Sequence, residues 1–325
     1  MVSIKKIASD IGVTAATVSN ALNGKGRVSK ALAGRIRARA DELGYRPSTA
    51  AIALKSGRSH VLGLVMPDLT NPLFPHIAQA LSIAADRLGF AILIADSRGS
   101  IEEQDLAINR LISRGVDGLL VVPQRGSSPT SLTTPMTIIN TASDPNNSVS
   151  ADHHGGGAQI ARHIVDLGHS NIIIIGADAV SDVQQDRIAG MTSQLPSGTK
   201  VEILWGQEGI EQACSRVAHG VSAILTTSDL VAINVHSHLS RAGFIVPDDV
   251  SLTGFDDMAF SIVMHPPLTT IAQDVETLAG YVLDIITAQI EGKASPHLGQ
   301  TVAMDLVLRH STTAPKSPSN KEPHS

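Results

Sequence analysis

The sequence predicts an α/β protein in which a small helical head precedes a core of two lobes, each built on a parallel sheet. Apolar residues at helical spacing in the first sixty positions predict the head. From residue 61 onward, short apolar runs alternate with amphipathic segments, and this alternation restarts after residues 136–140. A β-α-β-α-β order is typical of parallel sheets covered by helices, and the restart indicates a second lobe.

Three short helices are expected in the head. Gly12 ends the first, Thr14 can cap the second and Ser29 can cap the third. Pro47 ends the third helix, because proline disfavours helical backbone in the residue before it. The apolar stripes of the three helices consist of Ile4, Ile7, Ala8 and Ile11, of Val18, Ala21 and Leu22, and of Leu32, Ile36, Ala40 and Leu43.

The elements of the core follow from its apolar runs. In the first lobe we expect strands at 61–67, 90–96, 116–123 and 136–140, with helices at 72–88 and 102–113. In the second lobe we expect a helix at 156–167 and strands at 171–177, 201–205, 223–227 and 250–255, with helices between them. Two lobes in one chain form a cleft, which is a favoured place for a ligand.

Two polar segments interrupt this pattern. Residues 124–135 are too polar and too rich in proline for a helix, so the first lobe is expected to lack one there. Residues 311–325 have no apolar periodicity and are expected to be disordered.

The composition favours a cytoplasmic protein. No apolar run reaches the roughly 18–20 residues of a membrane span, and the first ten residues lack the apolar core of a signal peptide. The single cysteine, Cys214, excludes an internal disulfide and is most simply an inert core residue.

The charge is distributed unevenly along the chain. Residues 1–60 carry five lysines and six arginines against three acidic residues, a net charge of +8, while the remainder carries 14 basic and 27 acidic residues, a net charge of −13. A basic head on an acidic body indicates that the head binds a polyanion. Charge alone leaves an ordinary solvated surface equally possible.

The second helix of the head has an outward face of small and polar residues. Two helices joined by a tight turn form a helix-turn-helix, whose second helix enters the major groove of DNA. Asn20 can pair with adenine, and the alanines can touch the methyl group of thymine. A small three-helix domain with a polar face is the alternative, but the basic head makes groove binding the stronger interpretation. The predicted DNA-contacting residues here are Thr14, Ala15, Ala16, Thr17, Ser19, Asn20, Asn23 and Arg27.

Several motifs, in a consistent order over residues 2–310, resemble those of the LacI/GalR family of bacterial transcription regulators. They are IKKIASDIGVTAATVSNALNGKGRVS and ELGYRP in the head, and DLTNPLF, GVDGLL, DRIAG, VPDDVSLTGFDD and PPLTTIAQD in the body. The resemblance implies a helix-turn-helix domain at 1–46, a hinge helix and linker at 47–59, and a two-lobed core like that of periplasmic sugar-binding proteins at 60–310. It also implies that Ala51 and Leu54 lie on a hinge helix whose leucine wedges into the minor groove.

Effector-binding residues are expected at strand ends, where loops face the cleft, as for Asp96 and Trp205, and the same resemblance points to others in the matching motifs. Arg187 and Asp256 match an arginine and an acid that bind effector hydroxyl or carboxylate groups, with a surface ion pair as the alternative. For Phe74 and Trp205 the alternative is core packing, and for Asp96 it is a helix cap or turn. The full predicted set is Asn71, Phe74, Asp96, Asp152, Arg187, Trp205, Asp229, Asp256 and Gln273.

These observations favour a repressor whose affinity for operator DNA is controlled by a small effector. We expect a homodimer that binds double-stranded palindromic DNA, and a sugar, sugar acid or similar molecule between the two lobes. A stand-alone solute-binding protein and an enzyme are weaker alternatives, since no export signal, catalytic nucleophile or phosphate loop is recognisable. No cofactor is expected, and His153 and His154 lack the further ligands of a metal site.

Overall fold

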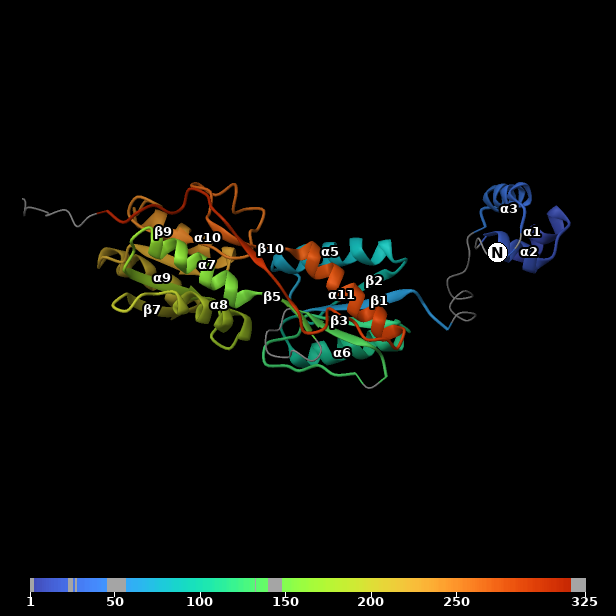
Figure 1. The fold of residues 1–325 in the computed structure, drawn as a ribbon, viewed down its shortest axis with the longest axis horizontal. Helices are drawn as coiled ribbons and strands as arrows, with labels where there is room; N and C mark the ends of the chain where they lie inside the picture. The colour runs from blue at the N-terminus through green and yellow to red at the C-terminus, as the bar shows by residue number, and fades with distance from the viewer. Residues whose placement is uncertain are drawn as a thin grey trace, which may run out of the picture. The chain divides into compact units, whose positions relative to one another are not determined.

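A computed structural model describes residues 3–22, 26, 28–45, 57–131, 133–139 and 148–316 (Figure 1). The chain divides into two compact units, Met1–Ser59 and His60–Ser325. The first unit is the helical head, and the second contains both lobes of the core.

The head consists of the three expected helices, α1 (Ile4–Ile11), α2 (Ala15–Leu22) and α3 (Lys30–Glu42). Their apolar stripes meet in a small core that includes Ile7, Val18 and Ile36, each with no exposed surface. The predicted caps are confirmed, because the hydroxyl groups of Thr14 and Ser29 accept backbone N–H groups at the starts of α2 and α3.

The first lobe is built on a six-stranded parallel sheet in the order β11-β5-β4-β3-β1-β2. Helices α5 and α11 pack on one face of this sheet, and α6 packs on the other. The elements are β1 (Val61–Met66), α5 (Leu73–Arg87), β2 (Ala91–Asp96), α6 (Ile101–Ser113), β3 (Gly118–Val121), β4 (Met136–Ile139), β5 (Ser148–Ala151), α11 (Val275–Ile290) and β11 (Thr301–Val302).

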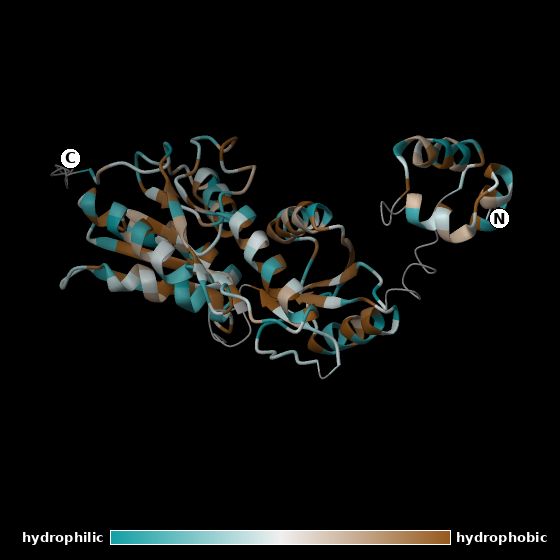
Figure 2. Ribbon diagram, turned by 45° about the vertical axis from the view of Figure 1, so that its right-hand side comes forward, coloured by the Kyte–Doolittle hydropathy of each residue, from teal (hydrophilic) through white to brown (hydrophobic). Residues whose placement is uncertain are grey.

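The second lobe has a four-stranded parallel sheet in the order β7-β6-β8-β9. Alternate isoleucines of β6 face α7 and α8 on one side of this sheet and α9 and α10 on the other, in keeping with the brown strands within this lobe in Figure 2. The elements are α7 (His153–Asp166), β6 (Asn171–Gly176), α8 (Asp182–Ser193), β7 (Lys200–Trp205), α9 (Gly206–Ala218), β8 (Ala223–Thr226), α10 (Asp229–Arg241) and β9 (Ser251–Thr253).

The chain passes between the two lobes three times, which the sequence did not predict. It enters the second lobe at α7, returns to the first lobe for α11 and β11, and crosses again at β12 (Met304–Val307). There β12 pairs antiparallel with β10 (Thr270–Gln273), whose next residues lead into α11. The crossing segments therefore lie side by side, with Gln273 directly opposite Met304.

The described part of residues 124–135 contains no helix, as expected. A buried polar network holds the start of this segment. The side-chain nitrogen of Gln124 donates to the Ser97 hydroxyl over 2.8 Å, and the Gln124 backbone N–H donates to the Gln104 side chain over 2.6 Å. The adjacent Arg125 forms an ion pair with Asp178 of the second lobe.

The expectation of a disordered segment beginning at residue 311 is wrong for residues 311–316, which pack against the second lobe. Ser311 is 1% exposed, and its hydroxyl donates to the Leu252 carbonyl over 2.6 Å. The backbone N–H of Thr313 donates to the Ser251 hydroxyl over 3.0 Å, while the Thr313 carbonyl accepts from that hydroxyl and lies 2.8 Å from a ring nitrogen of His169. Polar side chains and backbone groups thus fix a segment that hydropathy could not identify. We call residues 311–316 the C-terminal strap.

Within the described residues, no helix is long and apolar enough to span a membrane.

Candidate nucleic-acid interface and effector site

The α2 helix presents the predicted contact face at the surface of the head. Thr14, Ala15, Ala16 and Asn20 are exposed, whereas Val18 and Ala21 are buried in the head core. Thr17 and Ser19 are half-buried at the edges of the face. Because three of the exposed side chains are the small residues alanine and threonine, the α2 backbone can approach the floor of a DNA groove closely. Asn20 is the exposed polar side chain of this face that can hydrogen-bond to a base edge.

Thr14 has a structural function in addition to its predicted contact. Its hydroxyl lies 3.1 Å from the Thr17 backbone nitrogen and 2.9 Å from the Thr17 hydroxyl, so it caps the helix from outside. An ion pair also fixes the head, since Asp10 of α1 accepts two N–H groups of Arg39 in α3. The predicted contacts Asn23, Arg27, Ala51 and Leu54 lie outside the described residues.

In the second lobe, the structure brings three of the predicted effector residues together. The Arg187 guanidinium in α8 donates to an Asp256 carboxylate oxygen over 2.8 Å, and the Gln273 amide donates to the same oxygen over 2.6 Å. These side chains are almost completely buried, so the alternative of a surface ion pair is excluded. We call Arg187, Asp256, Gln273 and the neighbouring His153 the polar cluster.

Further contacts fix the Arg187 side chain. It donates to the Thr227 carbonyl over 2.6 Å and to the Nδ1 atom of His153 over 3.3 Å. Its guanidinium carbon lies 4.0 Å from the ring centroid of Phe255, a cation–π arrangement. The guanidinium plane is therefore held by groups from several different segments of the second lobe.

Close approach of α7 and α8 makes this arrangement possible. A β-carbon at Gly157 would lie 2.1 Å from the Arg187 carbonyl oxygen, and one at Gly190 would lie 2.0 Å from the His154 carbonyl oxygen. Only glycine permits such backbone contact at these two positions. The crossing places the first turn of α7, with His153, beside Arg187.

The backbone of Asp256 is strained, with a φ of 103° that side-chain-bearing residues rarely adopt. Burial raises the pKa of Asp256, while Arg187 and Gln273 act in the opposite direction. The attraction of the guanidinium thus does not fully offset the loss of hydration. Backbone strain and a buried charge in one residue are typical of functional sites.

Asp229, predicted as an effector contact, has both carboxylate oxygens engaged in internal hydrogen bonds. It is fully buried, and its two oxygens accept three internal hydrogen bonds, from the Met258 backbone and from the Ser261 and Thr270 hydroxyls. These bonds connect the start of α10 to two other segments of the second lobe. Burial raises the pKa of Asp229 to about 6.

Two other residues predicted to bind effector have structural contacts. Asp152 caps α7 by accepting the Gly155 backbone N–H over 2.8 Å. Trp205 is half-buried beside the second-lobe core, and a β-carbon at Gly176 would lie 2.3 Å from its ring. The core-packing interpretation of Trp205 therefore has direct structural support.

Of the three residues predicted in the first lobe, Asp96 ends β2, Asn71 lies in the loop after β1, and Phe74 lies in the first turn of α5. Asn71 accepts the Leu73 backbone N–H at the start of α5, and Asp96 accepts the Arg98 backbone N–H in the turn after β2. Phe74 is half-buried and packs on the first-lobe core. None of the three has a hydrogen bond or ion pair to the polar cluster in the described structure.

His153 is the member of the cluster that sequence reasoning missed as an effector residue. It is fully buried, and its Nε2 atom has no hydrogen-bond partner among the described residues. Burial, and then the positive charge of Arg187, lower the pKa of His153 well below its ordinary value, so the ring is neutral. In the sequence, only the position of His153 directly after Asp152 could have suggested an effector contact. The burial of its side chain depends on contacts with α8, which the sequence does not show.

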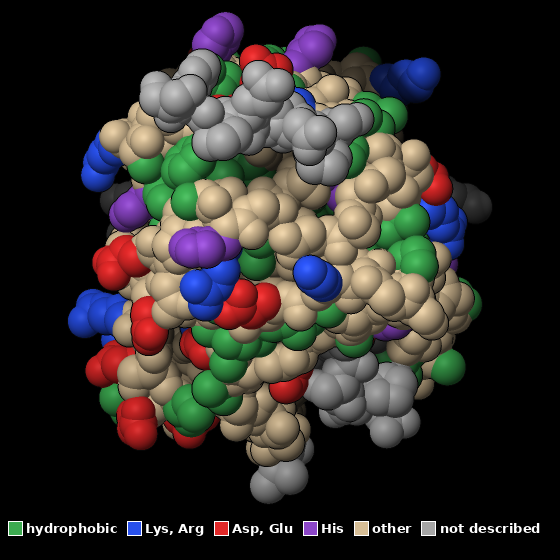
Figure 3. Space-filling view, turned by 90° about the vertical axis from the view of Figure 1, so that its left-hand side faces the viewer, with side chains coloured by type: hydrophobic (Ala, Val, Ile, Leu, Met, Phe, Trp, Pro, Cys, Tyr) green, Lys and Arg blue, Asp and Glu red, His purple; other side chains and the backbone are tan. Residues whose placement is uncertain are grey.

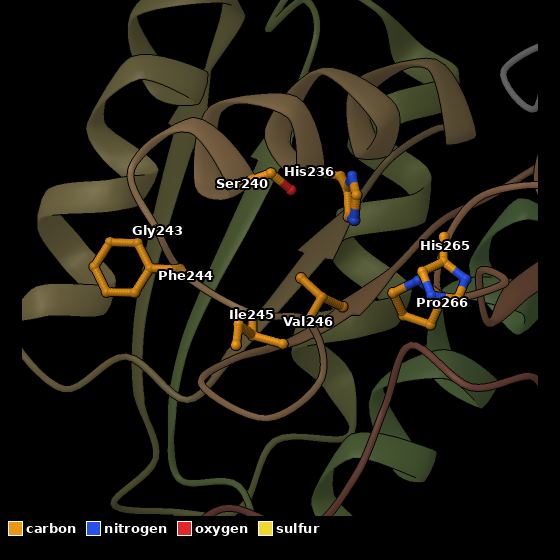
Figure 4. A pocket seen from close by; sticks show the side chains of 8 residues that line it. All are labelled: His236, Ser240, Gly243, Phe244, Ile245, Val246, His265 and Pro266. Atoms are coloured by element: carbon orange, nitrogen blue, oxygen red, sulfur yellow. The ribbon is translucent and has the colours of Figure 1, made fainter.

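Two other features of the core are separate from this cluster. A cavity of about 390 Å³ is lined by α10, by the loop at 243–246 and by His265 and Pro266, and it contains no member of the polar cluster (Figure 4). On the end of the core drawn in Figure 3, acidic, basic and histidine side chains are interspersed and form no extended basic area among the described residues. No group of three or more potential metal ligands occurs within the described ranges.

A helix-turn-helix head joined to a two-lobed core with a buried polar site defines a ligand-responsive DNA-binding regulator. Residues 3–48 match the model of bacterial regulatory proteins of the lacI family, and residues 161–312 match a periplasmic binding protein-like domain. The chain belongs to the LacI family of bacterial transcription regulators.

Full-length relatives agree with this assignment. The HTH-type transcriptional regulator reg1 of Streptomyces lividans is 30% identical over 95% of this chain and 96% of its own length. The ribose operon repressor of Escherichia coli K12 is 26% identical over 89% of this chain and 93% of its own. The lac repressor dimer, solved with operator and the anti-inducer ONPF, has a TM-score of 0.83 and 25% identity, covering 96% of this chain and 99% of that chain.

Proposed function

We propose that this protein represses transcription by binding a palindromic operator through the α2 face, with Asn20 as the main polar reader of base sequence. The observation that supports this most directly is the exposed face of α2, where small side chains surround one exposed asparagine. The net charge of +8 in residues 1–60 supplies the sequence-independent attraction to phosphate groups. Thr14, Thr17 and Ser19 lie at positions suited to phosphate contacts.

The proposed regulator of this binding is a small polyhydroxylated effector held where the two lobes meet. Arg187, Asp256 and Gln273 form the second-lobe side of the proposed site, and Asn71, Phe74 and Asp96 belong to the first-lobe side. A ligand that contacts both lobes would favour one arrangement of the three crossing segments over another. That difference in affinity between two lobe arrangements is what couples effector binding to DNA binding.

The proposed assembly is a cytoplasmic homodimer. The lac repressor was solved as a dimer on its operator, and two heads related by two-fold symmetry match a palindromic site. Half-sites are then expected roughly one helical turn of DNA apart.

The experiment is an electrophoretic mobility shift with palindromic DNA from the promoter region of the protein's own gene. Wild-type protein should bind this DNA more tightly than scrambled DNA of the same composition. Asn20→Ala should lose discrimination of about 1–3 kcal/mol at one operator position. Asn234→Ala, the same change at an exposed position on α10 of the second lobe, should leave DNA binding unchanged. An Asn20→Ala protein with the wild-type preference at every position would contradict the assignment.

A further inference from the structure

Within the described part of the chain, two buried polar atoms of the polar cluster have no hydrogen-bond partner, and their chemistry is complementary. One is Nε2 of His153, and the other is the side-chain oxygen of Gln273. Both residues contact the same ion pair, His153 through Arg187 and Gln273 through Asp256. A buried polar atom without a partner is costly, so a polar group that reached it would be bound favourably.

Existing contacts fix which of these atoms donates and which accepts. Arg187 can only donate, so Nδ1 of His153 must be the accepting nitrogen and the neutral ring carries its proton on Nε2. The Asp256 oxygen accepts from the Gln273 amide nitrogen, so the free atom of Gln273 is its oxygen. The cluster therefore offers one N–H donor and one carbonyl acceptor.

The charges around the cluster disfavour an anion. Asp256 already neutralises Arg187, and the neighbouring ionisable groups include the acidic Asp152, Asp186 and Asp229 together with the exposed His154. A carboxylate ligand would add a negative charge beside three acidic groups, where the positive charge of Arg187 is already paired with Asp256. A hydroxyl group has no charge and can both donate and accept, which suits both free atoms.

We infer that His153 is a specificity-determining residue of the effector site, which orients Arg187 through Nδ1 and donates Nε2–H to a hydroxyl oxygen of an uncharged polyol or sugar. This inference rests on the proposed function, since it places the effector at the polar cluster. It narrows the effector class from sugars and sugar acids to neutral polyhydroxylated molecules.

Three substitutions separate the two functions of the imidazole ring. His153→Asn keeps an acceptor close to the Nδ1 position but removes the Nε2 donor. His153→Leu removes both groups while keeping much of the volume. His154→Leu is the matched control, because His154 is the next residue of α7 and its side chain is exposed.

Binding is measured by calorimetry on the full-length protein, with neutral aldopentoses and aldohexoses as probes and the corresponding aldonates as charged counterparts. For the neutral sugar that binds wild type most tightly, His153→Asn should weaken binding about 10-fold and His153→Leu about 100-fold, with His154→Leu unchanged. An aldonate that binds more tightly than its parent sugar, or His153→Leu with wild-type affinity, would overturn the inference.

A second measurement does not depend on the ligand. In full-length protein labelled with ¹³C at the histidine Cε1 position, the His153 resonance is identified by its loss in His153→Asn. It should not titrate between pH 8 and pH 6, because burial lowers the pKa of His153 well below its ordinary value. Titration of His153 in this range would show that its ring is not the fixed neutral acceptor for Arg187. If no sugar or aldonate binds, the proposed effector class and the Nε2–H contact both fail, and the titration still decides whether His153 positions Arg187.

Discussion

The Arg187–Asp256 ion pair has almost no contact with solvent, with side-chain exposures of 4% and 6%. Removing one partner therefore leaves an uncompensated buried charge. We expect Asp256→Asn to lower the free energy of unfolding by about 3–5 kcal/mol in urea denaturation. Glu103→Gln, which breaks the exposed pair with Arg110, should cost less than about 1 kcal/mol. Equal losses in the two variants would mean that the buried pair is hydrated in solution.

Asp229 gives the protein a distinctive pH dependence, because its folded pKa of about 6 lies above its ordinary value of 3.8. A raised carboxyl pKa means that the folded state binds the proton more tightly. The contribution of Asp229 to stability is thus greatest below pH 4 and decreases as pH rises through 6. The difference corresponds to about 3 kcal/mol.

Asp229→Asn should reveal this effect, since the amide does not ionise. The stability of wild type relative to this variant should decrease by about 2 kcal/mol between pH 4 and pH 7, measured by urea denaturation at each pH. Comparing the two proteins cancels the carboxyl groups with lowered pKa, such as Asp10 and Asp274, which act in the opposite direction. Parallel pH profiles would contradict the raised pKa.

At the scale of elements, the α7–α8 crossing depends on backbone contact at two glycines. Gly157→Ala should lower the free energy of unfolding by about 3 kcal/mol and weaken the His153–Arg187 contact, because the two helices must separate. Gly280→Ala is the matched control in α11, where a β-carbon meets nothing within 4 Å. That change should stabilise the protein by up to about 1 kcal/mol. Equal thermal melting temperatures for the two variants would be evidence against a tight crossing.

The sequence predicted individual elements better than their assembly. Strands such as β1 and β6 are continuous apolar runs, because both faces of their sheets are covered. The return of α11 to the first lobe could not be predicted, since its apolar residues show that it is buried but not which sheet it contacts. The C-terminal strap was missed because Ser311 and Thr313 are held by hydrogen bonds that leave no hydrophobic pattern.

The candidate effector site shows the same contrast between single residues, which the sequence predicts, and their assembly, which it does not. Arg187, Asp256 and Gln273 were proposed from motifs, and in the structure both Arg187 and Gln273 donate to Asp256. Asp229 has the same chemistry and also lies in a motif, but three internal hydrogen bonds occupy its oxygens. His153 went unrecognised because its importance depends on α8. Residue type identified the candidates, whereas burial and hydrogen-bond partners distinguished them.

For the whole molecule, the contacts of the C-terminal strap lead us to expect that stability depends sharply on whether a truncation removes residues 311–316. A chain ending at residue 310 loses the hydrogen bonds of Ser311 and Thr313, and we expect its second lobe to lose about 2–4 kcal/mol of stability. A chain ending at residue 316 keeps these contacts and should melt at the wild-type temperature in calorimetry. If the shorter chain also melted there, the strap would contribute nothing to stability.

The strap also determines which part of the protein a label attached beyond residue 316 follows. A fluorophore or fusion partner attached beyond residue 316 is tethered through Thr313 and Ser311 to the second lobe, next to β9. Such a label follows the effector-binding core rather than the DNA-binding head. Paired with a second fluorophore on the first lobe, it would give a direct optical measure of lobe rearrangement on effector binding, with the operator-contacting surface left unmodified.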